Sequence, residues 1–234
     1  MNRLNKRLTR FVCMVAAMVM AAPALAISAA DEDHHYVAIY MARRLEMHSD
    51  AVKYARANIK DATLMHSTIA RVYKIEADAT TDVNIKNDRL SKARAELANA
   101  KDESGRVQAA ALELDIADAQ AQRSGPAIKR TVEDQIAQLA SLYSALKSQS
   151  MSDPDFITKG LERYNAMIRA AYEQCRGLLI RAKLEGAGTP ERAKYLNQIP
   201  EVLNDARFMV NTDVAVQPEW LFESYFLEGD AILA

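Results

Sequence analysis

The strongest constraint on this chain is the recurrence of apolar residues at every third or fourth position along most of its length. This spacing is typical of one face of an α-helix, whereas a half-buried strand alternates apolar and polar residues. The pattern is clearest between residues 126 and 147, at Ile128, Val132, Ile136, Leu139, Tyr143 and Leu146. Alternating runs of Val, Ile, Thr and aromatic residues are missing from the sequence. The sequence therefore predicts an all-α fold.

Prolines and glycines mark where the helices should begin and end. Gly is found only 7 times and Pro 6 times in 234 residues, and most of these prolines suit the first turn of a helix. Helices are expected over 33–48, 51–79, 83–102, 104–123, 126–147, 154–185 and 200–211. Two further helices are expected to begin at Pro190 and at Pro218. A polar loop, a candidate hinge, is expected over 148–153. Short connections predict antiparallel helical hairpins, packed as a bundle or as a short α-solenoid.

Residues 1–26 have the pattern of an export signal. Four basic residues precede an apolar run of 12 residues over 11–22, which is too short to span a bilayer as a helix. Pro23 is followed by a small-x-small cleavage site at Ala24-Leu25-Ala26, and Ser28-Ala29-Ala30 is a second candidate site. We expect a periplasmic or secreted product, the alternative being an uncleaved anchor helix. The remainder divides into an N-terminal helical hairpin, 27–82, and a helical-repeat or bundle region, 83–234.

Charge and cysteine usage exclude two further classes of protein. Residues 1–26 carry four of the 30 basic residues and none of the 31 acidic ones, so the exported chain has a net charge of −5. No basic face for phosphates is evident, and nucleic acid is not an expected partner. Cys175 is the only cysteine after residue 26, which excludes an intramolecular disulfide. Its place on an apolar stripe favours core packing over an intermolecular bridge.

Ala-rich stretches in the second half have the small-and-large spacing of helical repeats. Examples are Ala93-x-x-x-Leu97-x-x-Ala100, Leu112-x-x-Asp115-Ile116-x-x-Ala119 and the segment 223–231. Over 83–234 the chain resembles tetratricopeptide-type repeats, although the period of 34 residues is missing. That resemblance implies a concave surface that binds protein.

Residues 33–79 contain all four histidines of the chain, together with several methionines. The run His34-His35-Tyr36-Val37-Ala38-Ile39-Tyr40-Met41-Ala42 resembles the exported helical-bundle family known as domain of unknown function 305. Residues 52–66 are similar to the related domain of unknown function 4142. These resemblances imply a four-helix, ferritin-like bundle, with copper or silver bound by His and Met in some members. A second His-His motif is missing from this chain.

The spacing of these side chains independently suggests a metal site. His34, Met41 and His48 are seven residues apart and would share one face of a helix, with Met65 and His66 alongside on the next one. Imidazole and thioether ligands suit copper in an oxidising compartment. The candidate ligands are His34, His35, Met41, His48, Met65 and His66. In the alternative interpretation the methionines are ordinary core and the histidines are exposed or hydrogen-bonded.

Catalytic motifs are missing from the sequence. It has no His-Glu-x-x-His, no Gly-rich phosphate loop, no Gly-x-Ser-x-Gly and no Cys-x-x-Cys-His. We therefore expect a non-enzymatic scaffold that binds a protein partner in the cell envelope and needs no cofactor. The alternative is a periplasmic copper-binding bundle. The aromatic segment from Pro218 onward should dock back on the body, unless it forms an exposed patch for a partner.

Overall fold

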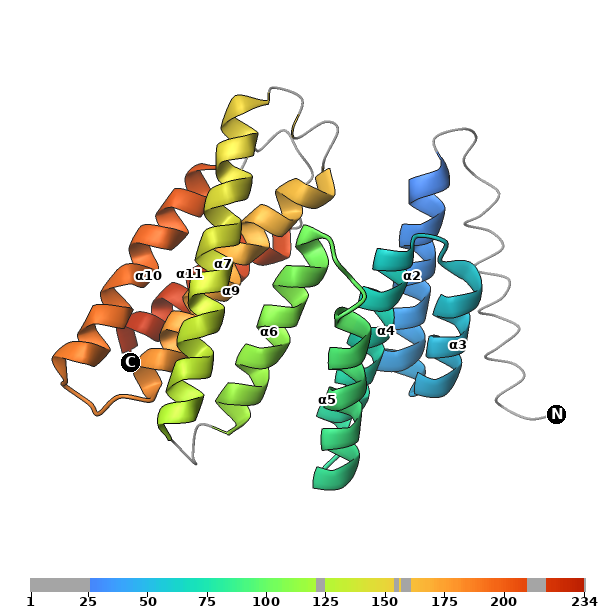
Figure 1. Cartoon of the computed structure of the whole chain (residues 1–234), viewed down its shortest axis with the longest axis horizontal. Helices are drawn as coiled ribbons and strands as arrows, with labels where there is room; N and C mark the ends of the chain where they lie inside the picture. The colour runs from blue at the N-terminus through green and yellow to red at the C-terminus, as the bar shows by residue number, and fades with distance from the viewer. Residues whose placement is uncertain (1–25, 121–124, 154–155, 157–160, 210–217, 234) are drawn as a thin grey trace.

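The fold was examined in a computed structural model that describes residues 26–120, 125–153, 156, 161–209 and 218–233. The described residues form helices and no strands, so the predicted all-α class is confirmed (Figure 1). The helices are α2 (Ala26–Leu45), α3 (His48–Asn58), α4 (Ala62–Ala79), α5 (Val83–Leu97), α6 (Glu103–Ala119), α7 (Pro126–Ser152), α9 (Leu161–Lys183), α10 (Pro190–Phe208) and α11 (Pro218–Leu233). The expected export signal, 1–26, lies almost entirely outside the described residues.

The helices pack as two rows that follow the order of the chain. The first row is α2, α4, α6, α9 and α11, and each of its helices packs against the next one in the row. The second row is α3, α5, α7 and α10, and each of these helices fits against the two first-row helices that flank it in sequence. In Figure 1 the chain advances from α2, α3 and α4 on the right to α10 and α11 on the left. This pattern of neighbours is that of successively stacked hairpins.

The hydrophobic core runs along the interior of this stack as a series of clusters. The largest cluster lies between α6, α7, α9 and α10, and includes the fully buried Leu114, Leu139, Tyr164 and Met167. Smaller clusters join α9, α10 and α11 at one end, and α2, α3 and α4 at the other. α4 and α5 pack together across the expected boundary at residue 82. Cys175 is fully buried, as expected, and burial raises the pKa of its thiol to about 12.

Several helix starts follow the sequence signals. The Asp82 carboxylate accepts hydrogen bonds from the amides of Asn84 and Ile85 and caps α5. Thr189 caps α10 in the same way, through the amide of Arg192. Pro126 occupies the first turn of α7 after Gly125, where its missing N–H costs nothing.

The helix expected over 51–79 is wrong, because the chain breaks at Ile59–Asp61 into α3 and α4. Asp61 caps α4 by accepting from the amide of Leu64 at 2.7 Å. Asp31 of α2 accepts hydrogen bonds from the amides of Lys60 and Asp61, at 3.1 and 2.9 Å. These contacts satisfy backbone donors that the break leaves without helical partners. A carboxylate about thirty residues earlier in the sequence thus supports the break.

Other expected boundaries are also wrong. α2 begins at Ala26 rather than at residue 33, and α5 ends at Leu97 rather than at residue 102. α2 ends at Leu45 rather than His48, and Glu46 follows with a left-handed φ of 56°. The expected loop over 148–153 is largely helical, because α7 continues to Ser152. Pro200 lies inside α10 instead of separating two helices. A proline here removes one helical hydrogen bond, which the burial of Ile199 and Leu203 beside it offsets. In the described part of the chain, no helix has the length and apolar character needed to cross a membrane.

Candidate functional site

A row of charged side chains crosses from one first-row helix to the next. It consists of Lys74 of α4, Asp115 of α6, and Arg169, Glu173 and Arg176 of α9, and is called the polar row below. The Asp115 carboxylate bridges two helices, since one oxygen lies 3.1 Å from Lys74 Nζ and the other 2.5 Å from Arg176 Nη2. Glu173 continues the row, at 2.6 Å from Arg176 and 3.7 Å from Arg169. The alternating charges therefore tie α4, α6 and α9 together.

The side chains of the polar row are half-buried, with the exception of Glu173. Lys74, Asp115, Arg169 and Arg176 keep between 26 and 28% of their side-chain surface exposed, whereas Glu173 keeps 3%. Burial lowers the pKa of Arg176, but the nearby carboxylates of Glu173 and Asp115 outweigh burial and raise it overall. Burial also lowers the pKa of Lys74, but the carboxylates of Asp78 and Asp115 outweigh burial and raise it overall. Lys74 and Arg176 therefore stay protonated at neutral pH, and the row is partly open to solvent.

The polar row extends toward both ends of the stack. Burial, followed by the charges of Arg71 on α4 and Arg169 on α9, lowers the pKa of His35 to about 4. At the other end, burial and then the Glu223 carboxylate of α11 raise the pKa of Tyr172. Polar groups on all five first-row helices thus influence one another electrostatically.

The face of α9 that carries the polar row has a distinctive composition. Asn165, Arg169, Tyr172 and Arg176 recur at three or four positions and are half-buried, while most other positions of this helix are buried. The Oδ1 atom of Asn165 is buried and accepts no hydrogen bond from any described residue. A buried acceptor without a donor costs free energy. This strip combines a cation, an aromatic ring and an amide side chain.

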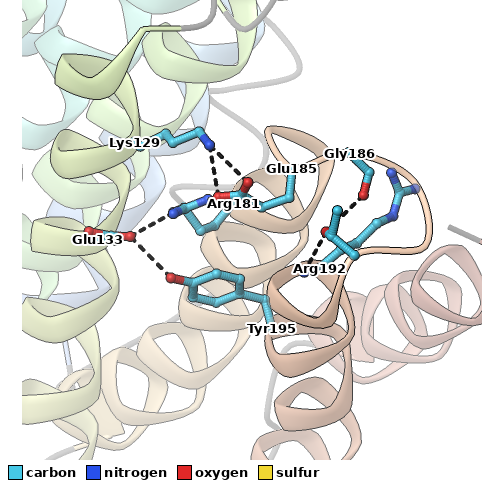
Figure 2. A network of polar contacts seen from close by, with 8 residues as sticks. Lys129, Glu133, Arg181, Glu185, Gly186, Arg192 and Tyr195 are labelled. Atoms are coloured by element: carbon cyan, nitrogen blue, oxygen red, sulfur yellow. Dashed lines mark hydrogen bonds and ion pairs between the residues drawn. The ribbon is translucent and has the colours of Figure 1, made fainter.

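A second network holds α7, α9 and α10 together at their ends (Figure 2). Arg181 of α9 is 7% exposed and contacts Glu185, as well as Glu133 of α7 at 2.7 Å. Lys129 donates to Glu185 at 2.8 Å, and the Tyr195 hydroxyl of α10 donates to Glu133 at 3.0 Å. Arg181 also stacks over the Tyr195 ring, 4.7 Å from its centroid.

This second network is best explained as a structural brace. Hydrogen bonds from Arg181, then from Tyr195, lower the pKa of Glu133, and those from Lys129 and Arg181 lower the pKa of Glu185. Both carboxylates therefore stay ionised and paired. Each charged group of the network has a partner within it, so the network ties α7, α9 and α10 together.

The structure gives three of the histidines separate partners. His34 Nδ1 lies 2.8 Å from the Tyr54 hydroxyl of α3, and His66 Nδ1 lies 2.7 Å from Glu96 of α5. His35 Nδ1 lies 2.7 Å from Thr68 Oγ1 of α4. Because the Thr68 hydroxyl donates to the Leu64 carbonyl, it accepts the proton of His35 Nδ1, which sets the tautomer of that ring.

The remaining candidate ligands lie on different helices. Met41 and the three partnered histidines are half-buried, and His48 begins α3. His48 therefore does not continue the helical face of His34 and Met41. Met65 packs against the cluster between α2, α3 and α4. Among described residues, no three side chains of His, Cys, Asp or Glu are grouped as a metal site would require.

Sequence reasoning missed the polar row. Charged residues at helical spacing are usually solvated, so the sequence does not single out Lys74, Asp115 and Arg176 as a site. A usable signal was present in α9, where the apolar positions cover most of the helix surface. The strip at 165, 169, 172 and 176 interrupts that apolar surface.

Comparisons of the chain with family models, with curated proteins and with solved structures find no match. The function is therefore argued from the geometry of the polar row and its surroundings.

Proposed function

We propose that this protein is an exported, non-catalytic scaffold that binds a segment of a partner protein along the polar row. The observation that carries the proposal is the half-buried face of α9, where Asn165, Arg169 and Tyr172 lie on one strip. Neighbouring helices contribute Lys74 and Asp115 to the same surface. A partner segment with its own donors and carboxylates can pair with these groups.

The ion pairs of the polar row support binding by holding the surface in one conformation. Arg176 is fixed between Asp115 and Glu173, and Lys74 is fixed between Asp115 and Asp78. Side chains that are already ordered lose little conformational entropy when a partner arrives. The rigid surface favours recognition of an extended segment by hydrogen bonds and charge rather than by apolar burial alone.

The second candidate function is copper binding by the His/Met residues. His34, His35 and His66 hydrogen-bond to three different side chains, so their rings do not converge on one metal position. Titration of the purified chain with Cu(I) and Cu(II) tests it directly. We expect no stoichiometric copper complex. A complex that forms with the wild type and is abolished in the double variant His34→Ala/Met41→Leu would favour the copper function instead.

The scaffold proposal is tested by cross-linking the purified chain to proteins of the cell-envelope fraction and mapping the cross-linked peptides by mass spectrometry. The variant Arg169→Gln/Tyr172→Ala removes a cation of the polar row and the aromatic ring next to it on α9. We expect it to weaken capture of the partner at least about tenfold, since losing 1.4 kcal/mol is a factor of ten. Lys92→Gln/Arg130→Gln, on exposed positions of α5 and α7, is the matched control and should bind normally.

Two outcomes count against the scaffold proposal. One is a partner whose cross-links and affinity are insensitive to Arg169→Gln/Tyr172→Ala. The other is that every protein captured by the control variant is also captured by the polar-row variant, or that neither captures any. Circular dichroism of both variants must show the helical content of the wild type before their binding is compared.

A further inference from the structure

The last helix of the first row, α11, has an exposed apolar face. Phe226, Ile232 and Leu233 are 76, 78 and 87% exposed, and Tyr225 is also exposed. These positions lie on one side of the helix, whereas Ser224, Leu227 and Ala231 on the other side are buried. Gly229 lies in the centre of the exposed face, and a Cβ added there would meet nothing within 4 Å. A large apolar face of this kind marks an interaction site.

The packing order of the stack explains why this face is open. The earlier first-row helices α4, α6 and α9 are each covered by the second-row helix that follows them, namely α5, α7 and α10. α11 is the last described helix and packs only against α9 and α10. Its exposed face is therefore the place where the next element of the stack would pack.

The opposite end of the stack offers a complementary surface. α2, the first helix of the first row, exposes Tyr36 and Tyr40 at 59 and 47%, followed on the same side by Arg43 and Arg44. From His34 to Leu45 the helix carries these two arginines and no acidic residue. α11 carries four carboxylates and no basic residue, although Arg207 of α10 pairs with one of them, Glu228, and lies over the Tyr225 ring. In Figure 1 α2 lies on the right of the molecule and α11 on the left, partly hidden behind other helices.

We propose that the exposed face of α11 binds the Tyr36/Tyr40/Arg43/Arg44 face of α2 in a second copy of this chain. Aromatic and aliphatic side chains then bury one another, and the arginines of one copy meet the carboxylates of the other, Asp230 being the most exposed of those beside the apolar face. Pairing of α11 with α11 of another copy would bring carboxylates together, which is unfavourable. The contact joins unlike surfaces, so copies add end to end. It does not depend on the scaffold function and leaves the polar row accessible.

The test is the mass of the purified chain in solution, measured by sedimentation and light scattering over a wide range of concentration. We expect the mass to rise continuously with concentration beyond that of a dimer. Phe226→Glu, which places a charge in the α11 face, should reduce the mass to that of one chain, and so should Tyr36→Glu in α2. Val83→Glu changes an equally exposed apolar residue on α5 and should assemble like the wild type.

Mixing the two single variants tests whether the α11 face of one chain binds the α2 face of another. Phe226→Glu retains an intact α2 face, and Tyr36→Glu retains an intact α11 face. An equimolar mixture should form a one-to-one pair and nothing larger, because each chain has one working end. Three results overturn the proposal: a wild type that is monomeric at all concentrations, assemblies that neither variant alters, or Tyr36→Glu dimers that form without the other variant. The last result would assign the contact to pairing between two α11 helices.

Discussion

At the residue scale, Asp31 supports the junction of three helices. It lies on α2 and accepts hydrogen bonds from the amides of Lys60 and Asp61, in the turn between α3 and α4. Asp31→Asn keeps the shape of the side chain but removes the charge and one acceptor oxygen. We expect it to lower the free energy of unfolding by about 1–2 kcal/mol, because hydrogen bonds to charged groups are stronger than neutral ones. Urea denaturation at neutral pH measures the loss, with the exposed Asp33→Asn as control.

The effect of Asp31 should also depend on pH. The hydrogen bonds from Asp61 and Lys60 lower the pKa of Asp31 below its ordinary value of 3.8. A carboxyl group with a lowered pKa in the folded state stabilises the protein above 3.8, and this contribution is lost as the pH falls below that value. The difference between the wild type and Asp31→Asn should therefore shrink in acid. A difference that stays constant down to low pH would contradict this assignment.

The stability of the protein should depend on His35 in a different range of pH, between about 4 and 6.5. Its pKa falls from 6.5 in the unfolded chain to about 4 in the folded one, because burial and then the charges of Arg71 and Arg169 oppose protonation. Between these values the unfolded chain binds a proton that the folded chain does not, so stability decreases as the pH falls. The loss should be on the order of 3 kcal/mol. Chemical denaturation at several pH values should show this slope for the wild type and a much smaller one for His35→Gln.

At the element scale, Gly105 determines how closely α6 follows α5. A Cβ at this position would lie 2.2 Å from the Ala100 carbonyl oxygen, a backbone atom that cannot move aside. Gly105→Ala should therefore destabilise the protein by about 2 kcal/mol or more, even though alanine favours helices. Gly229→Ala is the matched control, since its Cβ meets nothing, and it should stabilise the monomer by about 0.5–1 kcal/mol. Thermal denaturation at low protein concentration compares the two, and equal effects would contradict the packing argument.

The helices themselves were predictable where their ends are set locally. The side chains of Asp82 and Thr189 accept hydrogen bonds from the first turn of the helix that follows them, and Pro126 suits the first turn of α7, so the local sequence signal is sufficient at these starts. The break at Ile59–Asp61 was not predictable, because part of its support comes from Asp31 on another helix. Pro200 misled the prediction in the opposite direction, since the packing of Ile199 and Leu203 holds a helix that the local rule would end.

The candidate sites show the same limit. Regular spacing placed His34 and Met41 on one helix, but the partners of the histidines come from α3, α4 and α5 and depend on how the helices pack. The polar row likewise joins Lys74, Asp115 and Arg176 from three helices. The amino-acid sequence predicts which residues share a face of a helix, whereas the packing of the helices determines which faces come into contact.

At the scale of the whole molecule, the two-row stack makes stability a local property. Among the described residues, each first-row helix packs chiefly on its neighbours in the stack, so the ends are supported from one side and the centre from both. The largest apolar cluster, around Leu139 and Tyr164, lies between α6, α7, α9 and α10. In a structure of this kind stability is close to a sum of unit and interface terms, and the ends open first.

This arrangement predicts a graded pattern of amide hydrogen exchange. Amides of α2, α3 and α11 should exchange through local opening, and those of α6, α7 and α9 only through the least frequent, global opening. Ile69→Ala, in the fully buried cluster of α2, α3 and α4, should cost about 2–5 kcal/mol and speed exchange chiefly in α2 to α5. Leu139→Ala, equally buried in the central cluster, should speed exchange throughout the stack. Mass spectrometry of exchanged peptides distinguishes the two patterns. If both variants accelerated every helix equally, the molecule would unfold as one cooperative unit and the neighbour-by-neighbour account of its stability would be wrong.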